Sequence, residues 1–402
     1  MQDNFEHYGV RTQAIHAGEQ PDPTTGASAP NLVMSTTFIA DPDANFSVEG
    51  LEADAPYFYT RWGNPTVHQL EQKLCALEGA EAAVAFGSGM AAISGLFFHL
   101  LRSGDHLVIS DVTYAAAAEM SNELLPGLGI KITKVDMSDL DAVAAAITPQ
   151  TKLVYAETPC NPILRLTDIH AVAELAHAVG ALLAVDSTFA TPIGTRPFTF
   201  GADFVLHSLT KYIGGHGDAL GGVVLGRASE IEKMRQKVAI RTGGILSPFN
   251  AWLIMRGMAT LPLRMRAHAE NALQVANFLE KQTKIKRVIY PGLPSHPQFA
   301  LAQKQMKNFS GMLTFQVADG PAMARQLAER LKVFHYAVSL GHHRSLLFYM
   351  PTADLQASSF RLPPQQFASL QAYAGEGIFR VSIGIEDPED LCEDLAQAMK
   401  TA

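Results

Sequence analysis

The sequence predicts an α/β protein with a mostly parallel central sheet and a smaller α/β domain toward its C-terminus. From about residue 65 onward, short apolar runs alternate with amphipathic stretches, which is the pattern of strands and the helices that cover them. The runs are apolar at successive positions, as parallel strands are when both faces are buried. The chain has 402 residues, enough for two or three domains and a large core.

Residues 64–262 are expected to form the larger domain, which contains the central sheet. Its apolar runs have the length of strands, and stretches such as 90–101 and 169–179 have the period of helices. The predicted strands are residues 82–86, 106–110, 152–157, 182–186, 204–207 and 222–225.

Residues 263–402 are expected to form the smaller domain. A helical pattern over residues 251–266, interrupted by Pro262, leads into it. The remaining predictions for this domain are helices at 269–281 and 321–330, strands at 311–317 and 378–383, and a long loop at 351–364. Loops of that length are often functional.

Residues 1–63 differ from the rest of the chain in composition and in hydrophobic periodicity. They are rich in Pro, Asp, Thr and Gly and show little periodicity. The sequence therefore predicts an extended N-terminal arm rather than part of a domain core.

Composition excludes several classes of function. The net charge of −8 argues against a nucleic-acid partner, which needs clustered Lys and Arg. No apolar run approaches the roughly 18 residues that span a bilayer. The three cysteines, Cys75, Cys160 and Cys392, form neither a C-x-x-C pair nor a disulfide framework, so we expect no metal. The N-terminus lacks the apolar stretch of a signal peptide, which predicts a cytoplasmic protein.

Lys211 lies in the segment where candidate functional residues are most concentrated, FGADFVLHSLTKYIGGHGD at residues 200–218. Ser208 and Thr210 are two residues apart just after a predicted strand, so their hydroxyls point the same way. Two hydroxyls beside a lysine suit an aldehyde cofactor with a phosphate: the hydroxyls hold the phosphate and the amine forms a Schiff base. A surface lysine in a polar loop is the alternative.

Asp186 ends a strictly apolar predicted strand, where an ordinary core would place no charge. The pyridinium nitrogen of pyridoxal phosphate (PLP) would be a suitable partner, because its protonation makes the ring an electron sink. An aspartate that caps the following turn is the alternative. The segment Gly87-Ser-Gly89-Met90 also follows a strand and opens a helix, where backbone N–H groups can approach an anion.

Together these segments resemble the PLP enzymes of cysteine and methionine metabolism, from about residue 12 to the C-terminus. That family includes cystathionine synthases and lyases, methionine γ-lyase and O-acylhomoserine sulfhydrylases. The matching motifs are DSTFATP (186–192), HSLTKYIGGHGD (207–218), YTRWGNP (59–65), ETPCNP (157–162), SPFNAW (247–252) and RVSIG (380–384). The resemblance implies the aspartate-aminotransferase-like fold type I of PLP-dependent transferases.

The resemblance also implies how the cofactor is held. Lys211 would form the Schiff base and move protons among substrate Cα, cofactor C4′ and substrate Cβ, and Asp186 would pair with the pyridinium. The implied phosphate ligands are Gly89, Met90, Ser208 and Thr210, together with Tyr59 and Arg61 from the neighbouring subunit. The arm would therefore complete its neighbour's site, and the usual assembly would be a homotetramer built from two dimers.

Substrate contacts follow from the same resemblance. Tyr114 would stack on the ring and act as a general acid or base toward the leaving group. Arg380 would bind the substrate carboxylate as a bidentate fork, helped by Asn161 and the backbone near Ser339. Arg344 departs from the family pattern, because cystathionine-acting members often have a Glu there.

The leading hypothesis is a carbon–sulfur lyase that acts on cystathionine, methionine or a related amino acid and releases a thiol, ammonia and a 2-oxo acid. The first alternative is γ-replacement on an O-acylhomoserine, as in a sulfhydrylase or cystathionine γ-synthase. A non-catalytic PLP carrier and an aminotransferase are further alternatives. Ala116 stands where methionine γ-lyases typically have a Cys, which weakens that assignment.

Overall fold

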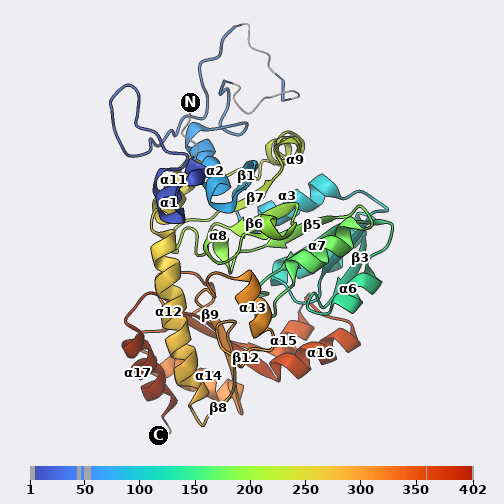
Figure 1. Ribbon diagram of the computed structural model, residues 1–402, viewed down its shortest axis with the longest axis vertical. Coiled ribbons are helices and arrows are strands. Elements are labelled where there is room, and N and C mark those ends of the chain that lie inside the picture. The colour runs from blue at the N-terminus through green and yellow to red at the C-terminus, as the bar shows by residue number, and fades with distance from the viewer. Residues whose placement is uncertain (1–4, 43–46, 49–55, 359, 401–402) are drawn as a thin grey trace.

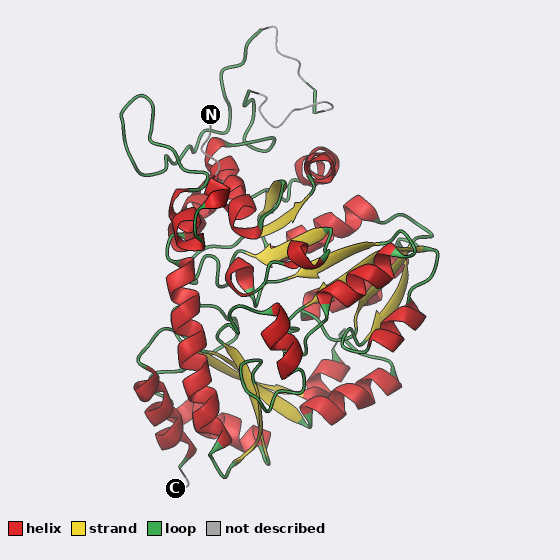
Figure 2. Ribbon diagram, in the orientation of Figure 1, coloured by secondary structure: helices red, strands yellow, loops and turns green. Residues whose placement is uncertain are grey.

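A computed structural model describes residues 5–42, 47–48, 56–358 and 360–400 of the chain. These residues form two β-sheets with helices packed against them, and the larger sheet lies above the smaller one in Figure 1. Figure 2 shows the strands of both sheets in yellow among the red helices. Parts of the predicted arm (1–4, 43–46 and 49–55) and residue 359 of the predicted loop lie outside the described residues.

The larger sheet has seven strands in the order β1-β7-β6-β5-β4-β2-β3. Neighbouring strands are parallel except that β7 is antiparallel to both β1 and β6. The prediction of a mostly parallel sheet is therefore confirmed. Its strands are β1 (Ala82–Phe86), β2 (His106–Ser110), β3 (Lys131–Val135), β4 (Thr151–Glu157), β5 (Leu182–Asp186), β6 (Phe204–Ser208) and β7 (Gly222–Gly226).

Sequence analysis missed β3, which is an edge strand. Two of its five residues are lysines, and only its last residue is buried. An edge strand exposes part of its surface, so it lacks the continuous apolar run by which the buried strands were found.

Helices cover the larger sheet on both faces. Leu107 and Val108 are neighbours in β2 but belong to different apolar cores: Leu107 shares its core with Phe97 of α3, and Val108 shares its core with Val172 of α7. Side chains alternate along a strand, so both faces of β2 are buried. The helices of this part are α2 (Pro65–Glu78), α3 (Gly89–Leu100), α4 (Ala115–Glu119), α5 (Leu125–Gly127), α6 (Leu140–Ala146), α7 (Ile169–His177), α8 (Thr191–Gly194), α9 (Ala228–Met234), α10 (Ile240–Thr242) and α11 (Pro248–Met258).

The smaller sheet has five strands in the order β10-β11-β12-β9-β8, and only β10 and β11 are parallel to each other. The strands are β8 (Ile285–Ile289), β9 (Met312–Val317), β10 (His335–Tyr336), β11 (Leu346–Pro351) and β12 (Gly377–Ser382). Its helices are α12 (Leu261–Glu280), α13 (Phe299–Gln305), α14 (Gly320–Arg330), α15 (Thr352–Ala357), α16 (Pro364–Ala374) and α17 (Pro388–Met399).

Two expectations for this part need correction. Pro262 does not interrupt a helix, because it lies in the first turn of α12, where a proline lacks no needed hydrogen bond. The break falls instead between α11 and α12, and α12 continues through the helix predicted at 269–281. The predicted loop at 351–364 contains the short helix α15, which has too few residues to show a clear period. The division of the chain at residues 262/263 stays a proposal.

The start of the arm is anchored to the larger part of the chain. Helix α1 (Val10–His16) packs on α2, and the buried Lys73 donates from Nζ to the carbonyls of Ala14 and Ile15, at 2.9 Å each. Lys73 also forms an ion pair with Glu19 at 2.5 Å. Beyond α1 the described residues of the arm form loops that extend away from both sheets, in blue in Figure 1.

Among the helices of the described residues, none combines the length and the apolar character needed to cross a membrane.

Candidate active site

The carboxyl ends of three neighbouring strands bring polar side chains together. Glu157 ends β4, Asp186 ends β5 and Ser208 ends β6. Lys211 follows β6 after two further residues. Ligand sites of open α/β sheets lie outside the carboxyl ends of their strands, so this edge is the natural place for a site.

Asp186 and Glu157 are paired in register on β5 and β4, and both carboxylates are buried. The backbone N–H of Thr188 donates to Asp186 Oδ1 at 3.0 Å, and the Tyr155 hydroxyl donates to Oδ2 at 3.3 Å. Burial raises the pKa of Asp186. No Lys or Arg among the described residues forms an ion pair with Asp186 within 4.0 Å, so this carboxylate is suited to a cationic partner from outside the chain.

Glu157 has a structural function in the same place. It accepts hydrogen bonds from Thr113 Oγ1 at 2.6 Å, from the N–H of Tyr114 at 2.6 Å and from the N–H of Asn161 at 2.7 Å. Burial and the nearby Asp186 raise the pKa of Glu157, while these three donors lower it. Glu157 therefore fixes the backbone of two predicted site residues.

The amine of Lys211 contacts the segment between β10 and β11 of the smaller sheet. Its Nζ donates to Ser339 Oγ at 3.0 Å. Burial, followed by the charge of Arg380, lowers the pKa of Lys211 to about 8. A lysine with this pKa has an appreciable fraction of uncharged amine near neutral pH, and the amine is the nucleophile in Schiff-base formation.

Arg380 of β12 contacts both of its predicted helpers. Its Nη1 donates to Asn161 Oδ1 at 3.1 Å and its Nη2 donates to the carbonyl oxygen of Ser339, also at 3.1 Å. Ser339 has a left-handed backbone with φ 85°, which is unusual for a residue other than Gly. This conformation lets one residue present its hydroxyl to Lys211 and its carbonyl to Arg380, and strain of this kind concentrates at functional sites.

The four predicted phosphate ligands of this chain lie near one another. Helix α3 begins at Gly89, and a Cβ added there would lie 3.0 Å from the Cβ of Ser208. The N-terminus of α3, which includes Met90, therefore lies against the end of β6. Thr210 Oγ1 accepts from the N–H of Gly221 at 3.1 Å. Helix N-termini attract anions, so a phosphate fits here.

Tyr114 lies at the start of α4 on the same side of the sheet. Its backbone N–H donates to Glu157, and the residue is 44% exposed. Burial lowers the pKa of Arg380, and Tyr114 is one of the groups that oppose this shift. The predicted stacking of Tyr114 on a cofactor ring stays a prediction.

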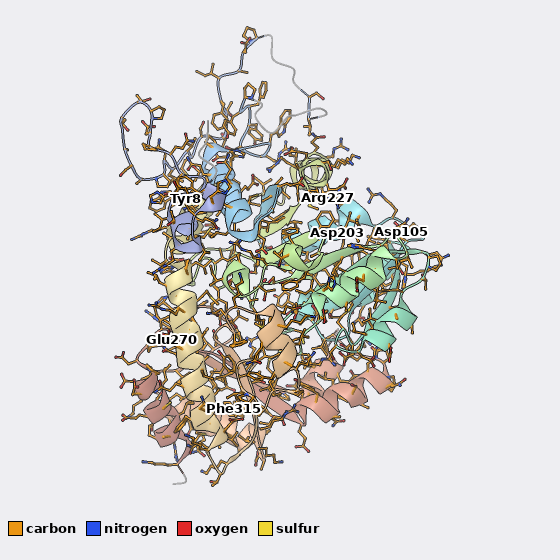
Figure 3. All side chains as sticks on the ribbon, viewed as in Figure 1. Tyr8, Asp105, Asp203, Arg227, Glu270 and Phe315 are labelled. Atoms are coloured by element: carbon orange, nitrogen blue, oxygen red, sulfur yellow. The ribbon has the colours of Figure 1, made fainter. Side chains whose placement is uncertain are left out.

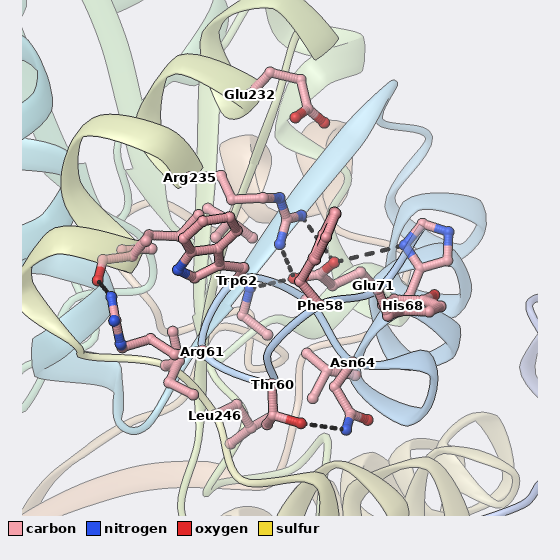
Figure 4. A pocket seen from close by; sticks show the side chains of 18 of the residues that line it. Phe58, Thr60, Arg61, Trp62, Asn64, His68, Glu71, Glu232, Arg235 and Leu246 are labelled. Atoms are coloured by element: carbon pink, nitrogen blue, oxygen red, sulfur yellow. Dashed lines mark hydrogen bonds and ion pairs between the residues drawn. The ribbon is translucent and has the colours of Figure 1, made fainter. Parts of the chain in front are cut away.

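Tyr59 and Arg61 have their described partners elsewhere. Arg61 Nη1 donates to the carbonyl of Ile240 at 2.7 Å, as the dashed line in Figure 4 shows, and its guanidinium lies 5.5 Å from the centre of the Tyr59 ring. Tyr59 pairs with Thr37 through an isolated β-bridge. Among the described residues, these interactions of Tyr59 and Arg61 do not reach Lys211 of their own chain, and the predicted role of both residues in a neighbouring subunit stays a prediction.

The sequence profile of the family described as "Cys/Met metabolism PLP-dependent enzyme" matches residues 11–400. The chain belongs to this family. PLP is accordingly its cofactor, and the prediction of a PLP-dependent enzyme of the transsulfuration family is confirmed.

Relatives with assigned names cover nearly the whole chain. A canavanine γ-lyase from Pseudomonas canavaninivorans is 41% identical over 399 residues, covering 98% of this chain and 97% of the relative. A cystathionine γ-synthase from Mycobacterium tuberculosis strain H37Rv is 42% identical over 401 residues, with 99% of each chain covered. An L-methionine γ-lyase from Pseudomonas putida is 39% identical over 398 residues, with 98% of each covered.

Solved structures confirm the predicted fold type. MetB from Corynebacterium glutamicum matches with a TM-score of 0.87 and 40% identity, covering 97% of each chain. A cystathionine γ-lyase from Lactobacillus plantarum complexed with L-serine matches with a TM-score of 0.86 and 36% identity, covering 97% of this chain and 98% of the other.

The site residues fit the family's cofactor. Asp186 is a buried carboxylate that no Lys or Arg of the described residues pairs with, which suits a pyridinium nitrogen. The N-terminus of α3 beside Ser208 suits the phosphate, and the amine of Lys211 suits the aldehyde.

Sequence reasoning gave no role to two groups near these residues. Tyr155 contacts Asp186, but it lies inside an apolar strand and looks like a core residue. His342 Nε2 lies 3.4 Å from Ser339 Oγ. The departure of the loop from the family pattern is the one sequence signal at His342, and Arg344 in the same loop carries that departure more plainly. Arg344 is exposed in the structure.

Proposed function

We propose that this protein is a PLP-dependent carbon–sulfur lyase that removes the γ-substituent of a sulfur amino acid, of the cystathionine or methionine type. The products would be a thiol, ammonia and a 2-oxo acid. The observation that carries the proposal is the placement of Ser339, which joins the Lys211 amine to the Arg380 guanidinium. The γ-lyase names of several relatives support the choice of the γ-carbon.

In this proposal Arg380 binds the carboxylate of the amino acid. Its guanidinium is oriented by Asn161 and by the Ser339 carbonyl, and a fixed fork binds a carboxylate through two hydrogen bonds. The Cα of the substrate is then held near Lys211. The same contacts would accept any α-amino acid, so they define the substrate class and leave its side chain open.

Lys211 is the Schiff-base lysine and the proton carrier in this proposal. The bound cofactor, paired with Asp186, supplies an electron sink for negative charge that develops at Cα. Lys211 removes the Cα proton as a free amine, and γ-elimination needs a second proton to be removed from Cβ. Tyr114, which is partly exposed at the start of α4, is the proposed acid or base toward the leaving group.

The second candidate is γ-replacement, in which a thiol or sulfide would form the new bond at Cγ while the original γ-substituent leaves. The relatives named cystathionine γ-synthase favour it. Lys211, Tyr114 and Arg380 would have the same roles in both reactions. The two candidates differ in whether an added nucleophile or water completes turnover.

The proposal includes a homotetramer made of two dimers, in which Tyr59 and Arg61 reach the phosphate of the neighbouring subunit. Exposed apolar side chains of the arm, such as Met34 and Ile39, support an assembly that covers them. The cytoplasmic location stays a prediction.

Product analysis tests the proposed reaction. The purified holoenzyme is offered cystathionine, methionine, homocysteine, cysteine and O-acetylhomoserine, each with and without sulfide. We expect 2-oxobutanoate and ammonia from a γ-thioether without any added nucleophile. Pyruvate from cystathionine would instead indicate β-elimination. Turnover only when sulfide accompanies the acyl ester would contradict the lyase and establish the replacement reaction.

A further inference from the structure

His342 lies in the segment between β10 and β11, and both of its neighbours are fixed. The N–H of Gly341 donates to Ser382 Oγ at 2.8 Å, and the N–H of His343 donates to the carbonyl of Gly215 at 3.0 Å. Gly341 has φ 73°, and a Cβ there would lie 2.5 Å from the backbone nitrogen of Tyr212. The segment is therefore held against the backbone that follows Lys211.

The His342 ring is packed in a defined place. A Cβ added to Gly217 would lie 2.7 Å from Cε1 of this ring, so the imidazole covers the glycine-rich stretch after Lys211. On its other side, Nε2 lies 3.4 Å from Ser339 Oγ, which accepts from Lys211 Nζ at 3.0 Å. His342, Ser339 and Lys211 thus form a series of three polar groups.

Several charged groups act on the imidazole. Burial, and then the positive charges of Lys211, His343 and Arg344, lower the pKa of His342, while Asp218 raises it. His216 adds a further imidazole beside His343, with ring centres 5.7 Å apart. The balance keeps His342 uncharged at neutral pH, and an uncharged imidazole can accept a hydrogen bond from the Ser339 hydroxyl.

We propose that His342 is a positioning residue that acts on Lys211 through the hydroxyl of Ser339. While His342 is neutral, Ser339 donates to Nε2 and turns a lone pair toward the Lys211 N–H. When His342 gains a proton, Nε2–H donates to Ser339 Oγ instead, and a new positive charge lies near Lys211. Ser339 Oγ then accepts from both groups, so the hydroxyl hydrogen points elsewhere, and the added positive charge disfavours the protonated form of Lys211. This inference rests on the proposed role of Lys211.

Two substitutions separate the hydrogen bond from the charge. His342→Gln keeps a neutral polar group of similar reach but removes the titration, and His342→Phe keeps the ring packed on Gly217 but removes the hydrogen bond. His335→Gln, at an exposed histidine of β10, is the control. The first readout is the pH titration of cofactor absorbance in the resting holoenzyme, which needs no turnover and responds to charge near the Schiff-base nitrogen that Lys211 then supplies. The second is kcat and KM as functions of pH.

We expect the absorbance of His342→Gln to lose a transition below pH 6.5 that the unchanged enzyme and His335→Gln both show. The acid-side fall in kcat should move to lower pH in the same variant. His342→Phe should lower kcat about three- to tenfold, the size of one lost hydrogen bond, while KM changes less than twofold.

Absorbance titrations of His342→Gln and the unchanged enzyme that coincide would overturn the proposal, even if His342→Phe folds poorly. If no amino acid is turned over, the proposed function fails but the absorbance titration still decides the role of His342. A loss of kcat in both variants with unchanged pH dependence would show a purely structural role and would also overturn it.

Discussion

Lys211 donates a hydrogen bond of 3.0 Å from Nζ to the hydroxyl of Ser339, a residue 128 positions later in the chain. This contact joins the end of the seven-stranded sheet to the segment before β11. Ser339 also accepts a hydrogen bond from Arg380 through its carbonyl. The same residue therefore positions both the Lys211 amine and the carboxylate-binding guanidinium of Arg380. The proposed chemistry needs both groups in fixed relation, since misplacement by about 1 Å can cost a hundredfold in rate.

Replacing Arg380 should weaken the use of every amino-acid substrate. Arg380→Ala removes two charge-assisted hydrogen bonds to the carboxylate, so we expect kcat/KM to fall about a hundredfold or more. Steady-state kinetics measure this, with Arg325→Ala at an exposed site as the control. An unchanged kcat/KM would remove Arg380 from the substrate site.

Asp186→Asn should have opposite effects with and without the cofactor. Burial raises the pKa of Asp186, so the folded apo-protein binds a proton there more tightly than the unfolded chain does. At pH values above the ordinary pKa of a carboxyl group, ionised Asp186 therefore lowers the free energy of unfolding. This destabilisation becomes smaller as pH falls below the raised pKa that Asp186 has in the folded protein. The neutral amide should raise the melting temperature of the apo-protein at pH 8 by about 2 °C, with a smaller effect at pH 4.

The holoenzyme should respond to Asp186→Asn in the other direction, because the pyridinium loses its partner. We expect weaker cofactor retention in dialysis and a lower melting temperature than the unchanged holoenzyme. An apo-variant that is less stable than the unchanged apo-protein at pH 8 would contradict the account of the buried carboxylate.

Schiff-base formation by the apo-protein should follow the protonation of Lys211. Burial and Arg380 lower the pKa of Lys211 to about 8, so the reactive amine becomes more abundant as pH rises through 8. Stopped-flow absorbance after mixing with PLP should give a rate with its midpoint near this pH. Arg380→Gln should move the midpoint upward, because a nearby positive charge is lost. A midpoint near 10 in the unchanged protein would show that Lys211 is not perturbed.

Arg61 offers a test of a shared site. Arg61→Ala should weaken cofactor retention, because it removes a cation proposed to bind the phosphate of the neighbouring subunit. Mixing Arg61→Ala and Lys211→Ala chains under conditions of subunit exchange should give more activity than the two variants give separately, since some sites then receive both intact residues. If no activity returns although mixed oligomers form, Arg61 acts within its own chain or not at all.

The sequence predicted the central sheet well because its strands are buried on both faces. The runs that became β1, β2 and β5 have the predicted bounds, whereas the edge strand β3 and the short helix α15 lacked a continuous pattern. Asp186 and Lys211 were detectable because each is a charged residue at or shortly after the end of an apolar strand. Such local signals survive in a single sequence.

Long-range contacts were not detectable in this way. Ser339 and Arg380 entered only through the family resemblance, since nothing near them in the sequence indicates that they meet Lys211. His342 was not singled out because a histidine in a loop is usually an ordinary polar surface residue. Its contact with Ser339 depends on the left-handed backbone of Ser339, which the sequence does not indicate. The folded chain supplies that information.

Trapping the Schiff base by reduction tests the central claim most directly. The holoenzyme is treated with borohydride, digested and analysed by peptide mass spectrometry, with Lys211→Ala as the matched variant. The account predicts a pyridoxyl group on the peptide that contains Lys211 and none in the variant. A pyridoxyl group on another lysine, or no modified peptide from a holoenzyme that turns over its substrate, would contradict it.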